Sequence, residues 1–123
     1  MVVVNKAKEE IKNKIKQFII DDFNYIGIGT GTTAATESDT ALETELLRLA
    51  RFGYDEDVNS VTVNAFLSAT QGNGSALTEV GTFKEASAGD MYSRDVDTVI
   101  NKTQFIEVWY EITAEYDAEI NYL

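Results

Sequence analysis

The feature that most constrains the fold is an alternation of apolar and polar residues in the second half of the chain. Between residues 60 and 70, one side of the backbone carries Val61, Val63, Ala65 and Leu67, and the other carries Thr62, Asn64, Phe66 and Ser68. The segment 104–116 alternates in the same way. Successive side chains of a strand point to opposite faces, so this period of two predicts β-strands.

Several other segments are predicted to be strands. They lie at 23–31, 76–83 and 91–99, and the Asn73-Gly74 pair between two predicted strands is the strongest short hairpin signal in the chain. Short strands at this spacing, without long helices between them, favour an antiparallel β-sandwich or a barrel. We therefore predict a mainly β fold, with a sandwich over residues 22–123.

The N-terminal segment has a different period. Apolar residues recur at helical spacing from residue 4 to residue 20, with Lys and Glu on the other side: Val4, Ala7, Ile11, Ile15, Phe18 and Ile19. Asp21 and Asp22 would lie unfavourably at the negative end of the helix dipole, so we expect the helix to end at about Ile20. The chain is thus predicted to be a single domain, 1–123, with an amphipathic helix over 1–21.

A second, short helix is predicted after a polar loop at 32–39. Thr40 and Glu43 have the spacing of a capping box, and the helix would extend to about Ala50. An extended path from Leu49 onward is the alternative, because apolar and other residues begin to alternate there.

The composition limits the chemistry that the chain can perform. It contains no Cys and no His. Disulfides, thiolate chemistry and imidazole metal sites are therefore impossible, and the commonest general acid–base side chain is missing. We predict that the protein is not an enzyme and uses no cofactor or metal.

The net charge of −11 is unevenly distributed. Residues 1–16 contain five Lys and two Glu, a local balance of +3, so the rest of the chain carries −14. An acidic body of this kind repels phosphate, which argues against nucleic acid as a partner. The basic helix has two Glu on its polar face and no Trp, so we expect it to pack onto its own sheet or a neighbouring copy rather than onto a membrane.

Two short motifs resemble ligand sites without completing them. Gly27-x-Gly29-x-Gly31 has Thr32 at the third position of the dinucleotide fingerprint, so a structural turn is the preferred interpretation. Asp55-x-Asp57-x-Asn59 matches the start of a calcium loop, but Phe66 stands where that loop needs a bidentate Glu. An EF-hand is excluded, and a weak surface Ca²⁺ site stays open.

Glutamates offer a further alternative. Glu43, Glu45, Glu107 and Glu111 could supply a carboxylate pair of the kind that glycosidases use. Chance pairs are expected among 21 acidic residues, so glycoside hydrolysis is not the preferred interpretation.

Arg94 lies in the middle of a predicted strand, in a region poor in basic residues. Glu79 lies in the middle of the preceding strand and becomes a cross-strand partner if the two strands form a hairpin. The first interpretation is a structural ion pair between Glu79 and Arg94. The alternative is that Arg94 reaches across a subunit boundary.

A series of segments, in a fixed order, resembles small structural proteins of tailed viruses, including the N-terminal parts of phage tail-collar fibre proteins. The resemblance spans about residues 25–113 and is carried by the following runs: 25–33 (YIGIGTGTT), 38–45 (SDTALETE), 74–75 (GS), 77–83 (LTEVGTF), 89–94 (GDMYSR), 100–103 (INKT) and 109–113 (WYEIT). The segment 49–54 departs from the family pattern, because it lacks the usual basic or proline-containing stretch.

The resemblance implies a structural component of a virion, made in the host cytoplasm. It would assemble as a symmetric oligomer on the capsid or tail surface, in a decoration, collar or adaptor role, with copies of itself and other virion proteins as partners. The short chain is expected to be a surface protein or adaptor rather than a receptor-reaching fibre. The predicted interface residues are Ile11, Ile15, Phe18, Ile19 and Arg94.

A second functional hypothesis belongs to another class. Exposed Tyr and Trp side chains with loop carboxylates would suit a small carbohydrate- or calcium-dependent binding module.

Overall fold

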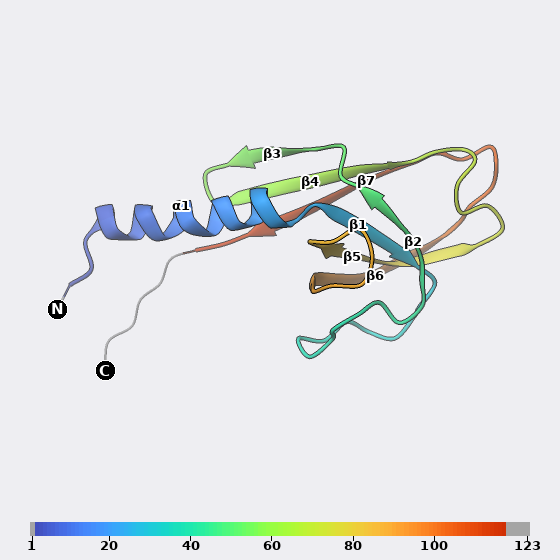
Figure 1. The fold of residues 1–123 in the computed structure, drawn as a ribbon, viewed down its shortest axis with the longest axis horizontal. Coiled ribbons are helices and arrows are strands. Elements are labelled where there is room, and N and C mark those ends of the chain that lie inside the picture. The colour runs from blue at the N-terminus through green and yellow to red at the C-terminus, as the bar shows by residue number, and fades with distance from the viewer. Residues whose placement is uncertain (1, 118–123) are drawn as a thin grey trace.

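The computed structural model describes residues 2–117 and contains one helix and seven strands in that range (Figure 1). The elements are α1 (Asn5–Asp22), β1 (Tyr25–Gly29), β2 (Glu45–Ala50), β3 (Gly53–Asp57), β4 (Ser60–Leu67), β5 (Ala76–Phe83), β6 (Met91–Asn101) and β7 (Val108–Glu115). Among the described residues, no helix is long and apolar enough to cross a membrane.

The strands form two antiparallel sheets, which confirms the predicted β-sandwich with an N-terminal helix. One sheet has the order β2-β1-β5-β6 and the other has the order β3-β4-β7. Figure 1 shows the two sheets as layers, with α1 extending beyond one end of them.

The core lies between the sheets and follows the alternation in the sequence. Val61, Val63, Ala65 and Leu67 of β4 are all buried, with at most 1% of their surface exposed. Ile26 and Ile28 of β1 and Leu77 of β5 face them from the other sheet, and Ile19 of α1 closes one end. Each large side chain in such a core stabilises the fold by about 1.5–3 kcal/mol.

Helix α1 extends to Asp22, two residues beyond the predicted end. The unfavourable acidic end is offset by Arg51, whose Nη1 donates hydrogen bonds to the carbonyl oxygens of Ile20 (2.6 Å) and Phe23 (3.2 Å). A cation at a helix C-terminus satisfies the last carbonyl groups and complements the dipole. The charges on the helix itself do not reveal this cation, because it comes from the β2–β3 connection.

The predicted second helix does not form. Residues 40–44 are irregular, and 45–50 form β2, which pairs with β1 so that Tyr25 lies opposite Ala50. The capping box fails because the Glu43 carboxylate accepts a hydrogen bond from the amide of Thr32 instead of reaching back to Thr40. A sheet partner outweighs local helix propensity, which is a weak preference.

The Asn73-Gly74 turn does not close a hairpin. It connects β4 in one sheet with β5 in the other, so the chain crosses between layers at this point. Gly72 and Gly74 both have positive φ, as tight turns require. The buried Lys102 holds the crossing in place, because its Nζ donates hydrogen bonds to Asn73 Oδ1 (2.8 Å) and the Thr103 carbonyl (2.9 Å).

Replacing Arg51 by Met tests the helix-end interaction. Two carbonyl groups lose a charged donor, so we expect the free energy of unfolding to fall by about 1.5–3 kcal/mol in urea denaturation. Lys84→Met, at an exposed cation, is the matched control. Equal stability losses in the two variants would contradict the assigned role of Arg51.

Candidate functional site

The loop formed by residues 30–44 covers the outer face of the β2-β1-β5-β6 sheet. Glycines make this close approach possible. A Cβ atom at Gly27 would lie 2.6 Å from a ring carbon of Phe83, and one at Gly81 would lie 3.0 Å from a methyl group of the buried Leu42. The glycines of the Gly27-x-Gly29-x-Gly31 motif are therefore structural, but not as the expected turn: Gly27 and Gly29 lie in strand β1, where the missing side chains let the loop approach.

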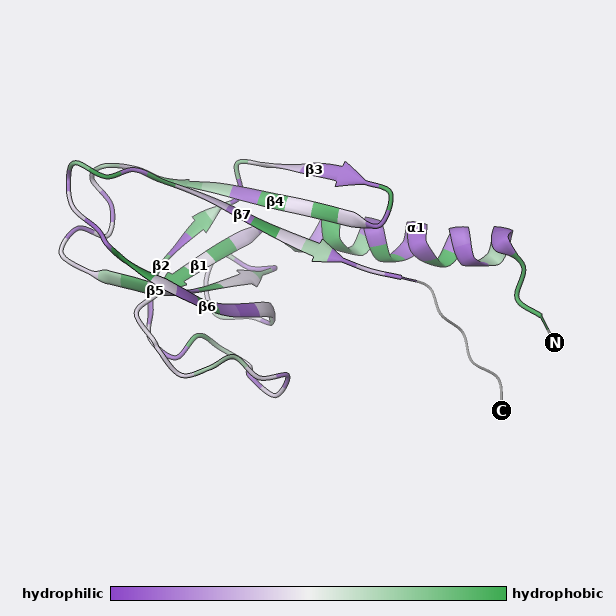
Figure 2. Cartoon of the chain, turned by 180° about the vertical axis from the view of Figure 1, so that it is seen from behind, coloured by the Kyte–Doolittle hydropathy of each residue, from purple (hydrophilic) through white to green (hydrophobic). Residues whose placement is uncertain are grey.

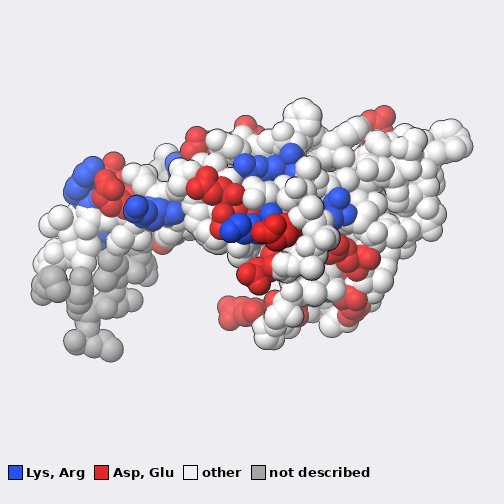
Figure 3. Space-filling model, viewed as in Figure 1, with Lys and Arg blue, Asp and Glu red and all other residues white. Residues whose placement is uncertain are grey.

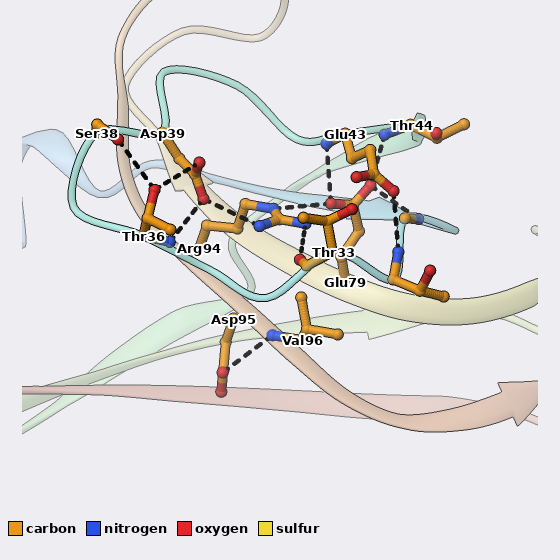
Figure 4. A network of polar contacts seen from close by, with 12 residues as sticks. Thr33, Thr36, Ser38, Asp39, Glu43, Thr44, Glu79, Arg94, Asp95 and Val96 are labelled. Carbon is orange, nitrogen blue, oxygen red and sulfur yellow. Dashed lines mark hydrogen bonds and ion pairs between the residues drawn. The ribbon is translucent and has the colours of Figure 1, made fainter.

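Glu79 fixes this loop to the sheet. Its side chain is fully buried, and Oε1 accepts hydrogen bonds from the amides of Gly31 (3.1 Å) and Thr44 (2.7 Å). Oε2 accepts a bond from the amide of Glu43 (3.0 Å) and contacts Arg94 Nε at 2.9 Å. Four donors thus surround one carboxylate, and three of them are backbone groups from the two ends of the loop (Figure 4).

Arg94 completes what we call the Glu79 network, defined as Glu79, Arg94 and the 30–44 loop groups bonded to them. Besides Glu79, its guanidinium contacts Asp39 Oδ2 (3.0 Å) and donates to the Thr33 carbonyl (2.8 Å). The side chain is 4% exposed. The two residues that the sequence pairs are therefore in contact, and all three guanidinium nitrogens bind groups of this chain. The geometry gives no support to the alternative in which Arg94 crosses a subunit boundary.

The network holds its carboxylates in the charged form. Burial raises the pKa of Glu79, but hydrogen bonds from Thr44, Glu43, Arg94 and Gly31 outweigh it, and the pKa lies below its usual value. The pKa of Asp39 is also lowered, mainly by hydrogen bonds from Thr36. A carboxylate with all its lone pairs occupied by fixed donors is suited to holding a loop in place.

The other acidic residues singled out in the sequence are dispersed. Glu45 pairs with Arg48 at 2.7 Å, and Glu111 accepts a hydrogen bond from Trp109 Nε1 at 2.9 Å. Asp55 and Asp57 lie on β3. Within residues 2–117, no group of three or more acidic side chains is placed to hold a metal ion.

The predicted interface residues of α1 differ in their surroundings. Ile19 is 4% exposed and belongs to the chain's own core, and Ile15 packs against that core. Ile11 is half-buried, whereas Phe18 keeps 43% of its surface exposed beside the rings of Phe23 and Tyr92. Ile11 and Phe18 are therefore the two that lie outside the core cluster of this chain.

The sandwich is open along one side, between the edge strands β6 and β7. A groove of about 340 Å³ lies there, and its apolar lining consists of Leu77, Val80, Ile100, Tyr110 and Ile112. Burial raises the pKa of the Tyr110 hydroxyl above its usual value. The sequence shows which face of β7 is apolar but not that the two sheets diverge here, so this groove escaped prediction.

A cluster of exposed aromatic side chains lies on the outer face of the other sheet. Phe52 is 77% exposed and packs edge-on against Trp109, with ring centroids 5.4 Å apart. Phe66 lies directly opposite Trp109 in the β4–β7 pairing and is 42% exposed. We call these three residues the aromatic cluster.

A scan against known protein families gives no match to this chain, and a search of the curated proteins gives none either.

Replacing Glu79 by Gln tests the network. Arg94 then keeps only Asp39 as a counter-charge, and the Gln amide presents an N–H donor to some of the four donors that bind Glu79. We therefore expect the free energy of unfolding to fall by about 3–5 kcal/mol, measured by urea denaturation. Glu115→Gln, at an exposed position of β7, is the control. A loss no larger than that of the control would show that the pair does not hold the fold together.

The network also predicts how stability depends on pH. Glu79, Asp39 and Glu43 have folded-state pKa values below their unfolded values, which are about 4.3 for Glu and 3.9 for Asp. Their contribution is complete above those unfolded values and is lost as the pH falls through the folded pKa values. We expect the melting temperature to stay level from about pH 7 to 5 and to fall below about pH 4. A flat profile down to pH 2.5 would contradict this prediction.

Proposed function

We propose that the chain is a structural component of a tailed-virus virion that assembles as a symmetric oligomer on the capsid or tail surface. The observation that carries this proposal is the position of α1. The helix extends past the sandwich (Figure 1), and its apolar row remains partly uncovered, with Val4 62% exposed and Phe18 43% exposed. Exposed apolar patches of this kind mark surfaces that meet other protein.

The resemblance to virion proteins gives further support, because its scattered segments meet in one place. The runs 25–33, 38–45, 77–83 and 89–94 supply the glycine-lined face, the covering loop, Glu79 and Arg94. A resemblance carried by residues that build one structural unit favours a shared architecture over chance matches.

The charge distribution supports a place on the outside of the particle. The body outside residues 1–16 carries a net charge of −14, since those residues hold five Lys and two Glu of a chain whose total is −11. An inner surface would lie against densely packed phosphate, which an acidic body repels. The basic helix can instead contact acidic neighbouring protein.

A carbohydrate- or calcium-dependent binding module is the second candidate. The aromatic cluster favours it, because exposed rings offer flat faces for stacking. A glycan array and calorimetry with Ca²⁺ on the isolated protein test this candidate, and a saturable response that is lost in Trp109→Ala would support it.

Sedimentation velocity at micromolar concentration and near-physiological salt tests the assembly. We expect a discrete oligomer, and negative-stain electron microscopy should show closed symmetric particles. Ile11→Asp should weaken the assembly at least tenfold, because it places a charge on the apolar row of α1 outside the core. Ser87→Asp, exposed in the β5–β6 connection and outside the groove, is the control: it adds the same charge and should leave assembly unchanged. Urea denaturation shows that both variants are folded.

A sample that remains monomeric under these conditions, and that binds no protein of a purified virion, would contradict the proposed function.

A further inference from the structure

The groove between β6 and β7 is flanked by negative charge. Asp95 and Asp97 line it and are exposed, whereas the Glu111 carboxylate is bonded to Trp109 on the outer face of its sheet. The Asp95 carboxylate points away from the Glu79 network (Figure 4), so it does not share the counter-charge of Arg94. The groove thus combines an apolar floor with an acidic rim.

The edge strand β6 is poorly suited to receive another strand. Its pairing with β5 shifts register between Leu77 and Glu79, which leaves β6 bulged at 97–99. Bulges and inward or flanking charges are the devices by which sheet edges resist added strands. An occupant of this groove is therefore expected to contact β6 through side chains rather than by adding a strand to it.

Positive charge that could meet the rim is concentrated on α1. The chain has ten Lys and Arg, and five of them lie in residues 1–16. Of the others, Arg48, Arg51, Arg94 and Lys102 bind groups within their own chain. Figure 3 shows Lys side chains along α1 and acidic clusters over the sandwich.

The helix also carries an apolar side chain that can fill the groove, between two of its lysines. Lys8 and Lys14 lie three residues before and after Ile11, so they flank it on the helix surface. Hydrophilic and hydrophobic residues alternate along the turns of α1 (Figure 2). A cavity of about 150 Å³ holds a benzene-sized group, so the groove of about 340 Å³ has room for about two large apolar side chains.

The helix does not reach the groove of its own chain. No α1 residue lines the groove, and the helix instead lies beside the β3–β4 turn, where Lys12 Nζ donates to Asn59 Oδ1 at 2.9 Å. Both surfaces are therefore present on every chain, but they cannot meet within one chain.

We propose that the groove between β6 and β7 receives the N-terminal half of α1 from a second copy of this chain. The pairing rests on the proposed assembly and specifies its contact. Ile11 enters the apolar floor, and Lys8 and Lys14 lie against Asp95 and Asp97. The contact joins two different surfaces, so it is heterologous and generates a ring when the rotation closes.

Cysteine cross-linking tests this contact directly, because the natural chain has no Cys. Two single variants, I11C and D97C, are given different tags, mixed and mildly oxidised. We expect the mixed disulfide dimer to form at least ten times more than in a mixture of I11C with E56C. Glu56 lies on β3, at the opposite edge of its sheet from β7, and is likewise exposed.

Sedimentation of the uncross-linked variants separates the two possible failures. An oligomer without preferential I11C–D97C cross-linking overturns this contact and leaves the proposed assembly standing. A monomer overturns both. Melting temperatures close to that of the natural chain show that the variants are folded.

A charge exchange provides a second readout. The double substitution of Asp95 and Asp97 by Lys should weaken assembly at least tenfold, and added salt should weaken the natural assembly because the contact pairs opposite charges. Introducing Glu at Lys8 and Lys14 in the same chain should restore assembly. Failure of that restoration in a folded protein counts against the proposed charge pairing.

Discussion

The buried carboxylate of Glu79 is the interaction on which the rest of this structure depends. Removing a carboxylate from water costs several kcal/mol even in a real protein interior, so a buried one persists only when it is fully bonded. Here three backbone amides and one guanidinium supply the compensation. The same bonds hold both ends of the 30–44 loop, and that loop in turn covers a sheet face lined with glycine.

The Glu79 network in turn depends on the glycines of the sheet face that the loop covers. The loop can approach its sheet only because Gly27 and Gly81 have no side chain, and Leu42 then fills the space over them. A glycine-rich strand is weak on its own, because glycine loses the most conformational freedom on folding. The Glu79 network and Leu42 offset this cost. A motif that resembles a phosphate-binding loop is thus explained by packing.

The sequence predicted where the strands lie more reliably than which strands pair with each other. The alternation along β4 placed Val61, Val63, Ala65 and Leu67 correctly in the core, because period two follows from backbone geometry alone. The helix predicted from Thr40 to about Ala50 was wrong, since Thr40 and Glu43 satisfy a local helix rule while the nonlocal pairing of β2 with β1 decides the outcome. The Asn73-Gly74 turn was found, but a turn signal does not say whether the next strand joins the same sheet.

The candidate site was likewise predictable from the sequence only in part. The Glu79–Arg94 pair could be predicted, because two oppositely charged residues in adjacent predicted strands have few other ways to be buried. The three amides that complete the network could not, since they come from a loop whose path no pattern specifies. The groove was also unpredictable, because it arises where two edge strands diverge, and divergence of sheets leaves no mark on the alternation of either strand.

The exposed half of α1 has a physical requirement of its own. Most helical stability in proteins comes from packing of the apolar face rather than from intrinsic propensity. Here the N-cap residue is Val4, which offers no side-chain hydrogen bond, and the first turn has no acidic residue, so the N-terminus of the helix lacks the usual local support. Only Ile19, near the other end, is buried. A contact that covers Ile11 would therefore stabilise the helix as well as join two chains, and folding of this segment would be coupled to assembly.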